Sequence, residues 1–165
     1  MIRAATKSAE DTRELAAAVA GVARAGDVVL LAGDLGAGKT TFAQGFARGL
    51  GVAEPVTSPT FVLVRPYEGR LRLAHVDLYR LDHLQEVVDL GLPELVDEGA
   101  VVLVEWGDVA PGPIASEFLE VRLTPGEADR RQLDLRLVGD RWRPRHSALV
   151  AALGRWAASP GVGEA

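Results

Sequence analysis

The segment GDLGAGKT at 33–40 limits the possible folds of this chain more than any other, because it matches G-x-x-x-x-G-K-[ST] at every position. It follows the short apolar run DVVLLAG and precedes a helix-favouring segment at 39–51. A loop of this kind turns its backbone N–H groups inward, and glycines leave room there for a polyphosphate. The sequence therefore predicts a buried strand, a phosphate loop and a helix in succession.

The residue types in this loop suit a nucleoside triphosphate bound together with Mg²⁺. The helix presents its positive N-terminal end to the anion, Lys39 can place an ammonium at the β- and γ-phosphates, and the Thr40 hydroxyl can ligate the metal ion. Of 18 basic residues only Lys7 and Lys39 are lysines, so one of the two stands where an ammonium is needed. The expected nucleotide contacts in this region are Gly33, Asp34, Leu35, Gly36, Ala37, Gly38, Lys39, Thr40 and Thr41.

The absence of asparagine restricts which nucleotide base the site could recognise. The guanine-reading motif N-K-x-D needs asparagine, and the chain contains none. The variant T-K-x-D fails as well, because Thr6 and Lys7 are followed by Ser8 and Ala9. ATP is therefore favoured by elimination, without a positive adenine signature.

Two acidic residues stand at the ends of predicted strands, where a phosphate-loop site needs a second oxygen ligand. Glu105 ends the apolar run AVVLVE, and Asp77 ends the more amphipathic run LRLAHVD. In the functional interpretation one of them binds Mg²⁺ and the other orients or deprotonates the attacking water. The alternative for each is an ordinary exposed carboxylate or a cap, and the residues alone do not assign the two roles.

A third polar feature is VTSPTF at 56–61, a stiff loop after the phosphate-loop helix. Ser58 and Thr60 are expected there to sense the γ-phosphate, and a simple turn into the next strand is the alternative. The histidines lack metal-ligand spacing, so they are interpreted as ordinary surface or core residues, and two tryptophans are interpreted as packing residues. These residues are His75, His83, His146, Trp106 and Trp142.

The remaining pattern predicts an α/β fold, a phosphate-loop NTPase-like three-layer sandwich with a mixed central sheet. Ser8 begins a capping pattern with Asp11 before the first helix. Strands are expected at 2–5, 27–33, 60–67, 70–78, 100–106, 118–124 and 130–138, and helices at 12–25, 39–51, within 84–99 and at 146–158. The pairs 60–67 with 70–78 and 118–124 with 130–138 are expected to be antiparallel. The chain is interpreted as one domain over 1–158 with a loose tail at 159–165.

Composition excludes several other classes of protein. The absence of cysteine removes disulfides, thiol catalysis and thiolate metal sites, and a net charge of −5 argues against a large basic surface for nucleic acid. The apolar runs are too short for a transmembrane helix, and the N-terminus lacks a secretory signal. A soluble cytoplasmic protein is expected.

Taken together, the motifs GDLGAGKTTF, VTSPTFVLV, YEG, HVDLYRL, LGLPEL and VLVEWGD occur in an order that closely resembles the TsaE family, formerly YjeE. These are small bacterial ATPases of tRNA threonylcarbamoyladenosine synthesis. The resemblance covers about residues 8 to 140. It implies that Thr40 and Glu105 are the magnesium ligands and that Asp77 is needed for ATP turnover. It also implies an adenine end near Thr12 and near Arg131, which is chosen over Arg130.

The resemblance further implies that the protein binds a complex of TsaD and TsaB and reaches tRNA only through that complex. ATP and Mg²⁺ would be its cofactors, and hydrolysis by the isolated protein would be slow. Arg80 is the nearest candidate for an arginine finger, although a surface arginine is favoured. Two other functions are weighed against this one, a small-molecule kinase and a nucleotide sensor without turnover. Lys39→Ala is expected to remove phosphate binding and to leave the fold intact.

Overall fold

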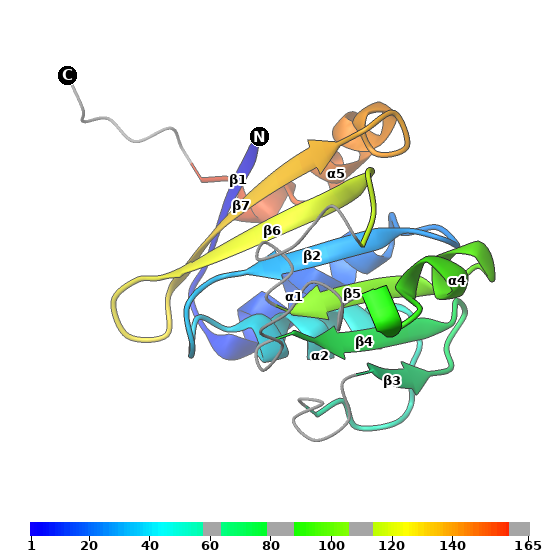
Figure 1. Ribbon diagram of the computed structural model, residues 1–165. Helices are drawn as coiled ribbons and strands as arrows, with labels where there is room; N and C mark the ends of the chain where they lie inside the picture. Colours follow the sequence, from blue (N-terminus) through cyan, green and yellow to red (C-terminus); the bar gives the residue numbers. More distant parts are fainter. Residues whose placement is uncertain (58–63, 79–87, 106–113, 159–165) are drawn as a thin grey trace.

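A computed structural model describes residues 1–57, 64–78, 88–105 and 114–158 and shows a three-layer α/β fold (Figure 1). Seven strands form one sheet in the order β1-β7-β6-β2-β5-β4-β3. The strands are β1 Ile2–Thr6, β2 Val28–Ala32, β3 Val64–Tyr67, β4 Leu73–Asp77, β5 Val101–Glu105, β6 Phe118–Pro125 and β7 Arg131–Val138. The α-helices are α1 Ala9–Ala20, α2 Lys39–Gly49, α4 Leu92–Asp97 and α5 His146–Ala152. The predicted fold class is confirmed.

The sheet is mixed, as the sequence predicts. Strand β2 pairs in parallel with both β5 and β6, and β5 pairs in parallel with β4. The two predicted antiparallel pairs are β3 with β4 and β6 with β7, and β1 adds an antiparallel edge beside β7. All five residues of β2 and of β5 are buried, which explains why β2 and the first four residues of β5 are continuous apolar runs.

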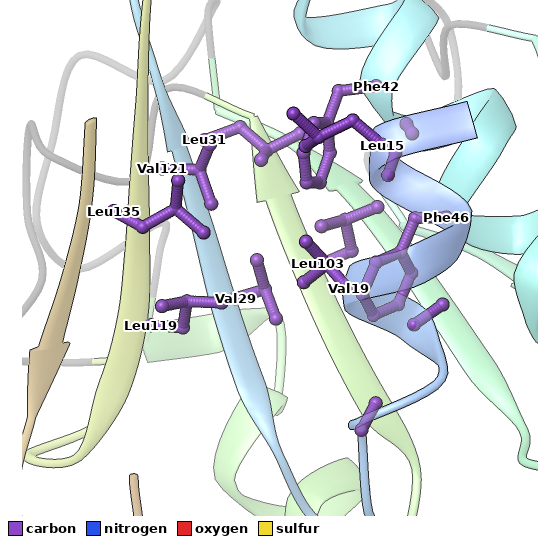
Figure 2. Packing of buried hydrophobic residues seen from close by; sticks show 14 of the residues in the cluster. Leu15, Val19, Val29, Leu31, Phe42, Phe46, Leu103, Leu119, Val121 and Leu135 are labelled. Atoms are coloured by element: carbon purple, nitrogen blue, oxygen red, sulfur yellow. The ribbon is translucent and has the colours of Figure 1, made fainter. Parts of the chain in front are cut away.

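Alternate residues of the central strands supply two separate cores. On one face, Val29, Leu31 and Leu103 pack among side chains of the two long helices, which Figure 2 labels as Leu15, Val19, Phe42 and Phe46. On the other face, Leu30, Val102 and Val104 pack with Leu92 of α4. Figure 1 accordingly shows α1 and α2 behind the sheet and α4 in front of it. Burying such side chains contributes about 1.5–3 kcal/mol each before the entropy cost.

Helix α1 has the predicted Ser8 cap, but it starts at Ala9, before the predicted 12, and it ends earlier than predicted. The Ser8 hydroxyl accepts a hydrogen bond from the Asp11 backbone N–H at 3.1 Å. The helix ends at Ala20 instead of continuing towards Gly26. The reason is tertiary: the buried Asp27 carboxylate accepts from the Arg24 backbone N–H at 2.7 Å and holds residues 24–27 in a turn that leads into β2.

The C-terminal helix is also shorter than the predicted segment 146–158. Helix α5 ends at Ala152, and a 3₁₀ turn at Gly154–Trp156 follows. Ala157 then forms an isolated antiparallel bridge with Ala4 of β1. The extended backbone that this pairing needs ends the helical segment. The tail at 159–165 lies outside the described residues.

Other boundaries differ by a few residues. Strand β4 starts at Leu73, later than the predicted 70, and residues 60–63 of its partner lie outside the described part. Helix α4 begins after Gly91, within the segment 84–99 that was predicted to contain helix. Among the described residues, no helix has the length and apolar character needed to cross a membrane.

Candidate nucleotide-binding site

The phosphate loop connects β2 to α2 in a backbone conformation that needs its glycines. Gly33, Gly36 and Gly38 have φ values of 146°, 82° and 107°, a region that other residues rarely adopt. A Cβ atom on Gly33 would also lie 2.7 Å from the Leu123 carbonyl oxygen of β6. The predicted strand, loop and helix are therefore present, and β6 packs directly behind the loop.

The side chain of Lys39 lies within the phosphate loop. Its Nζ donates to the carbonyl oxygens of Gly33 at 2.6 Å and Asp34 at 2.9 Å, and the residue is only 5% exposed. Leu35, at the opposite extreme, is 77% exposed at the tip of the loop. The arrangement places a cation among main-chain groups at the N-terminal end of α2, where a phosphate group is favoured.

Glu105 lies where the sequence predicts, at the end of a strand next to the phosphate-loop strand. It is the register partner of Leu31 in β2, and it is 3% exposed. The Thr40 hydroxyl, in the first turn of α2, donates to Glu105 Oε1 at 3.0 Å. The two residues that the TsaE resemblance assigns to Mg²⁺ are therefore in direct contact across 65 residues of sequence.

Asp77 lies beside Glu105 at the end of β4. The two are register partners in parallel strands, so their side chains project from the same face of the sheet. Asp77 is partly exposed, whereas Glu105 is buried. Because β4 is one strand further from β2, Glu105 is nearer to Thr40 and Asp77 is nearer to solvent.

His75 belongs to the same cluster, which sequence reasoning missed. Its Nε2 lies 2.5 Å from Glu105 Oε2, and the residue is completely buried. The sequence predicts an ordinary surface or core role for His75; the structure places it in the core and adds this contact. The available signal was strand periodicity, since His75 stands two residues before Asp77 and therefore on the same face of β4.

A small pocket next to the loop contains both residues assigned to the adenine end. Thr12 and Arg131 line it together with Gly38 and Thr41. The Thr12 hydroxyl is hydrogen-bonded to that of Thr6 at 2.7 Å. The Arg131 side chain reaches back to the loop, because its Nε donates to the Ala37 carbonyl oxygen at 2.9 Å.

Several other predicted site residues lie outside the described part of the chain. Ser58 and Thr60, the residues expected to sense the γ-phosphate, lie outside the described residues. Arg80 and Trp106 do too. Trp142 is fully buried, in agreement with its interpretation as a packing residue.

The donor set near Thr40 fits Mg²⁺. Within the described ranges, no group of three His, Cys, Asp or Glu residues could hold a metal ion. Mg²⁺ in phosphate-loop sites, however, takes few protein ligands and completes its shell with phosphate oxygens and waters. A hydroxyl on Thr40 and a carboxylate on Glu105, with a further carboxylate on Asp77, are the hard oxygen donors that this ion prefers.

The sheet order and the loop define an α/β protein of phosphate-loop NTPase-like architecture. A family model described as "Threonylcarbamoyl adenosine biosynthesis protein TsaE" matches residues 6–133. The chain belongs to the TsaE family.

Individual relatives agree with this assignment. The chain is 41% identical to the tRNA threonylcarbamoyladenosine biosynthesis protein TsaE of Bacillus subtilis over 138 residues, which cover 83% of this chain and 86% of the relative. It is 38% identical to the protein of the same name from Streptomyces coelicolor over 147 residues, which cover 84% of this chain and 99% of the relative. The crystal structure of Bacillus subtilis YdiB superposes with a TM-score of 0.76 at 35% identity, covering 94% of this chain and 97% of that one.

Proposed function

We propose that this TsaE-family protein binds ATP with Mg²⁺ and hydrolyses it to support repeated threonylcarbamoyl transfer to tRNA by a TsaB–TsaD complex. The observation that carries the proposal is the contact of Thr40 with Glu105 at the start of the phosphate-loop helix. A hydroxyl and a buried carboxylate meet there, and a second carboxylate, Asp77, occupies the adjacent register position. Oxygen donors of these types beside a phosphate loop support Mg²⁺-dependent phosphoryl transfer to water.

ATP would contact the phosphate loop with its phosphates and the neighbouring pocket with its ribose and base. The loop N–H groups, the positive end of α2 and the Lys39 ammonium would hold the β- and γ-phosphates. The small pocket between Thr12 and Arg131 opens next to Gly38 and would mark the side of the loop on which the ribose and base lie. In this proposal the Arg131 side chain, which already contacts the loop, covers the nucleotide from the β7 side.

Hydrolysis would depend on the two strand-end acids in different ways. When bound, Mg²⁺ would supply positive charge to the β- and γ-phosphate oxygens, and Thr40 and Glu105 would hold it. Asp77, which is partly exposed, would orient a water molecule and accept its proton as the oxygen attacks the γ-phosphorus. The bond from the γ-phosphorus to the bridging oxygen breaks, and ADP and phosphate leave.

The partners in this proposal come from the family. The relatives are named for tRNA threonylcarbamoyladenosine biosynthesis, and we extend that pathway to this chain. A net charge of −5 suits contact with tRNA through a protein complex better than direct binding. A role in tRNA modification also favours a cytoplasmic location.

Phosphate release by the purified protein tests the proposal. We expect slow hydrolysis that rises when the TsaB–TsaD complex is added and that stops when EDTA removes Mg²⁺. Glu105→Ala should lower the rate by about 10² or more, because a ligand acting on the transition-state charge is lost. Asp140→Ala is the matched control, since this carboxylate is 97% exposed and lies in an exposed pair with Arg143.

Three results would contradict parts of the proposal. A rate of ATP hydrolysis that does not change when TsaB–TsaD is added would indicate an ATPase with another role. Transfer of the γ-phosphoryl group to a small molecule instead of water would indicate a kinase. Full turnover in both Asp77→Ala and Glu105→Ala would refute the assignment of the two acids.

A further inference from the structure

We infer that His75 is a positioning residue for the magnesium site, because its imidazole holds one oxygen of Glu105 and so directs the other oxygen at Thr40. The inference rests on the proposed function. Among the described residues, His75 forms no hydrogen bond with the phosphate loop or with α2, and its hydrogen-bond partner is Glu105. Its effect on the nucleotide would pass through Glu105.

The geometry divides the Glu105 carboxylate between two partners. Oε1 accepts from the Thr40 hydroxyl at 3.0 Å, and Oε2 lies 2.5 Å from His75 Nε2. In the parallel register His75 is opposite Leu103, so its ring reaches diagonally towards the end of β5. The carboxylate is therefore held from the β4 side and from α2, and rotation about its last side-chain bond would break both contacts.

The hydrogen bonding of the imidazole indicates which atom donates. His75 is completely buried, and its Nδ1 has no hydrogen-bond partner among the residues that the structure describes. If Nδ1 carried the only proton, that N–H would be unmatched and two lone pairs would face each other at Nε2. With the proton on Nε2, only the Nδ1 lone pair is unmatched, so the ring donates to Glu105.

This arrangement is difficult to explain by packing alone. An apolar side chain would fill the space on β4 without an unmatched Nδ1, which costs stability, but it would leave Glu105 Oε2 without its partner. The neighbouring positions on the same face, Leu73 in β4 and Leu103 in β5, are apolar and buried. His75 adds the hydrogen bond to Glu105. In metal sites, hydrogen-bond partners of a metal-binding carboxylate fix the orientation of that carboxylate in the same way.

The test separates binding of Mg²⁺ from binding of the nucleotide. Isothermal titration calorimetry with a non-hydrolysable ATP analogue, in excess Mg²⁺ and in EDTA, gives the gain in affinity that Mg²⁺ produces. His75→Leu removes the donor and keeps apolar volume, and we expect this gain to fall by about 10-fold or more. The affinity in EDTA should stay within about 2-fold of the wild type, because the phosphate loop is untouched.

Two further substitutions distinguish positioning from packing. His75→Gln can present an amide N–H near the place of Nε2 and should restore most of the Mg²⁺-dependent gain. His75→Asn is too short to do so and should lose the gain, which keeps the test available if the leucine variant does not fold. Thermal melting followed by circular dichroism checks that each variant is folded.

A double-mutant comparison checks that the effect passes through Glu105. In a Glu105→Gln background, His75→Leu should change the Mg²⁺-dependent gain by less than about 2-fold. A folded His75→Leu or His75→Asn protein with the wild-type gain would overturn the inference, and so would equal losses in Mg²⁺ and EDTA. Failure of the wild-type protein to bind the analogue at all would overturn the proposed function as well.

Discussion

At the scale of single residues, Lys39 shows that a side chain aimed at a ligand can also hold its own loop together. Its ammonium donates to the carbonyl oxygens of Gly33 and Asp34 and is almost completely buried. The expectation that Lys39→Ala leaves the fold intact therefore needs a refinement. The substitution removes hydrogen bonds within the loop as well as a charge.

We expect Lys39→Ala to abolish measurable ATP binding and to lower the free energy of unfolding by about 1–3 kcal/mol, the usual effect of losing hydrogen bonds from a charged group. Calorimetry and urea denaturation measure the two quantities. Lys7→Ala is the control, because Lys7 is the other lysine of the chain and is exposed. Unchanged ATP affinity in Lys39→Ala would mean that the loop does not bind phosphate.

At the scale of secondary-structure elements, the contact between α1 and α2 sets the distance between the two halves of the candidate site. Helix α1 carries Thr12 and α2 carries Lys39 and Thr40. The helices approach closely at two glycines of α2, Gly45 and Gly49. This explains Gly45 in the interior of α2, where glycine is otherwise unfavourable by about 1 kcal/mol relative to alanine, and Gly49 at the last residue of the helix.

We expect Gly49→Ala to lower the free energy of unfolding by about 1–3 kcal/mol, because overpacking outweighs the better helix propensity of alanine. A Cβ atom there would lie 2.6 Å from the Ala17 carbonyl oxygen and 2.7 Å from the Ala20 Cβ, both on α1. Gly154→Ala is the matched control, since a Cβ atom at that position meets nothing within 4 Å. Urea denaturation of the two variants gives the comparison, and equal stability would show that the helices can separate at little cost.

At the scale of the whole molecule, a buried ion cluster joins the start of β2 to the C-terminal segment. Asp27 is fully buried, and Arg145 donates to both of its oxygens at 2.6 and 2.7 Å. Burial acts to raise the pKa of the Asp27 carboxyl, but hydrogen bonds from Arg145, the Arg24 backbone N–H and Arg141 outweigh it, and the net pKa lies below 3.8. A carboxyl with a lowered pKa stabilises the fold above about 3.8, and this stabilisation is lost as the pH falls through the folded-state value.

We expect Asp27→Asn to lower the free energy of unfolding at neutral pH by about 3–5 kcal/mol, because the substitution leaves a buried arginine without its counter-charge. The difference from the wild type should shrink as the pH falls below about 3.8. Urea denaturation at several pH values measures it. Asp140→Asn, which alters an exposed pair with Arg143, should change stability by less than about 1 kcal/mol. A constant difference between wild type and Asp27→Asn across the pH range would exclude a role for the ionised carboxylate.

Local chemistry explains which features could be predicted from the sequence. The phosphate loop, the Ser8 cap, the buried strands β2 and β5 and both antiparallel pairs depend on near neighbours in the chain and on periods of two or 3.6 residues. For the same reason, the strand-end positions of Asp77 and Glu105 were predicted correctly. The end of α1 was predicted wrongly, because its helix-favouring residues give way to a turn around Asp27, whose partner Arg145 is 118 residues away.

The sequence by itself therefore determined the α/β class, the phosphate loop and the two strand-end acids. Only the tertiary structure decided that Thr40 meets Glu105, that His75 holds the other oxygen of the same carboxylate, and that the C-terminal segment packs back on β1. These contacts depend on strand order and register, and backbone periodicity does not specify which strand lies next to which. Burial of the apolar faces of the helices and strands selects that order, and the polar partners are brought together as a result.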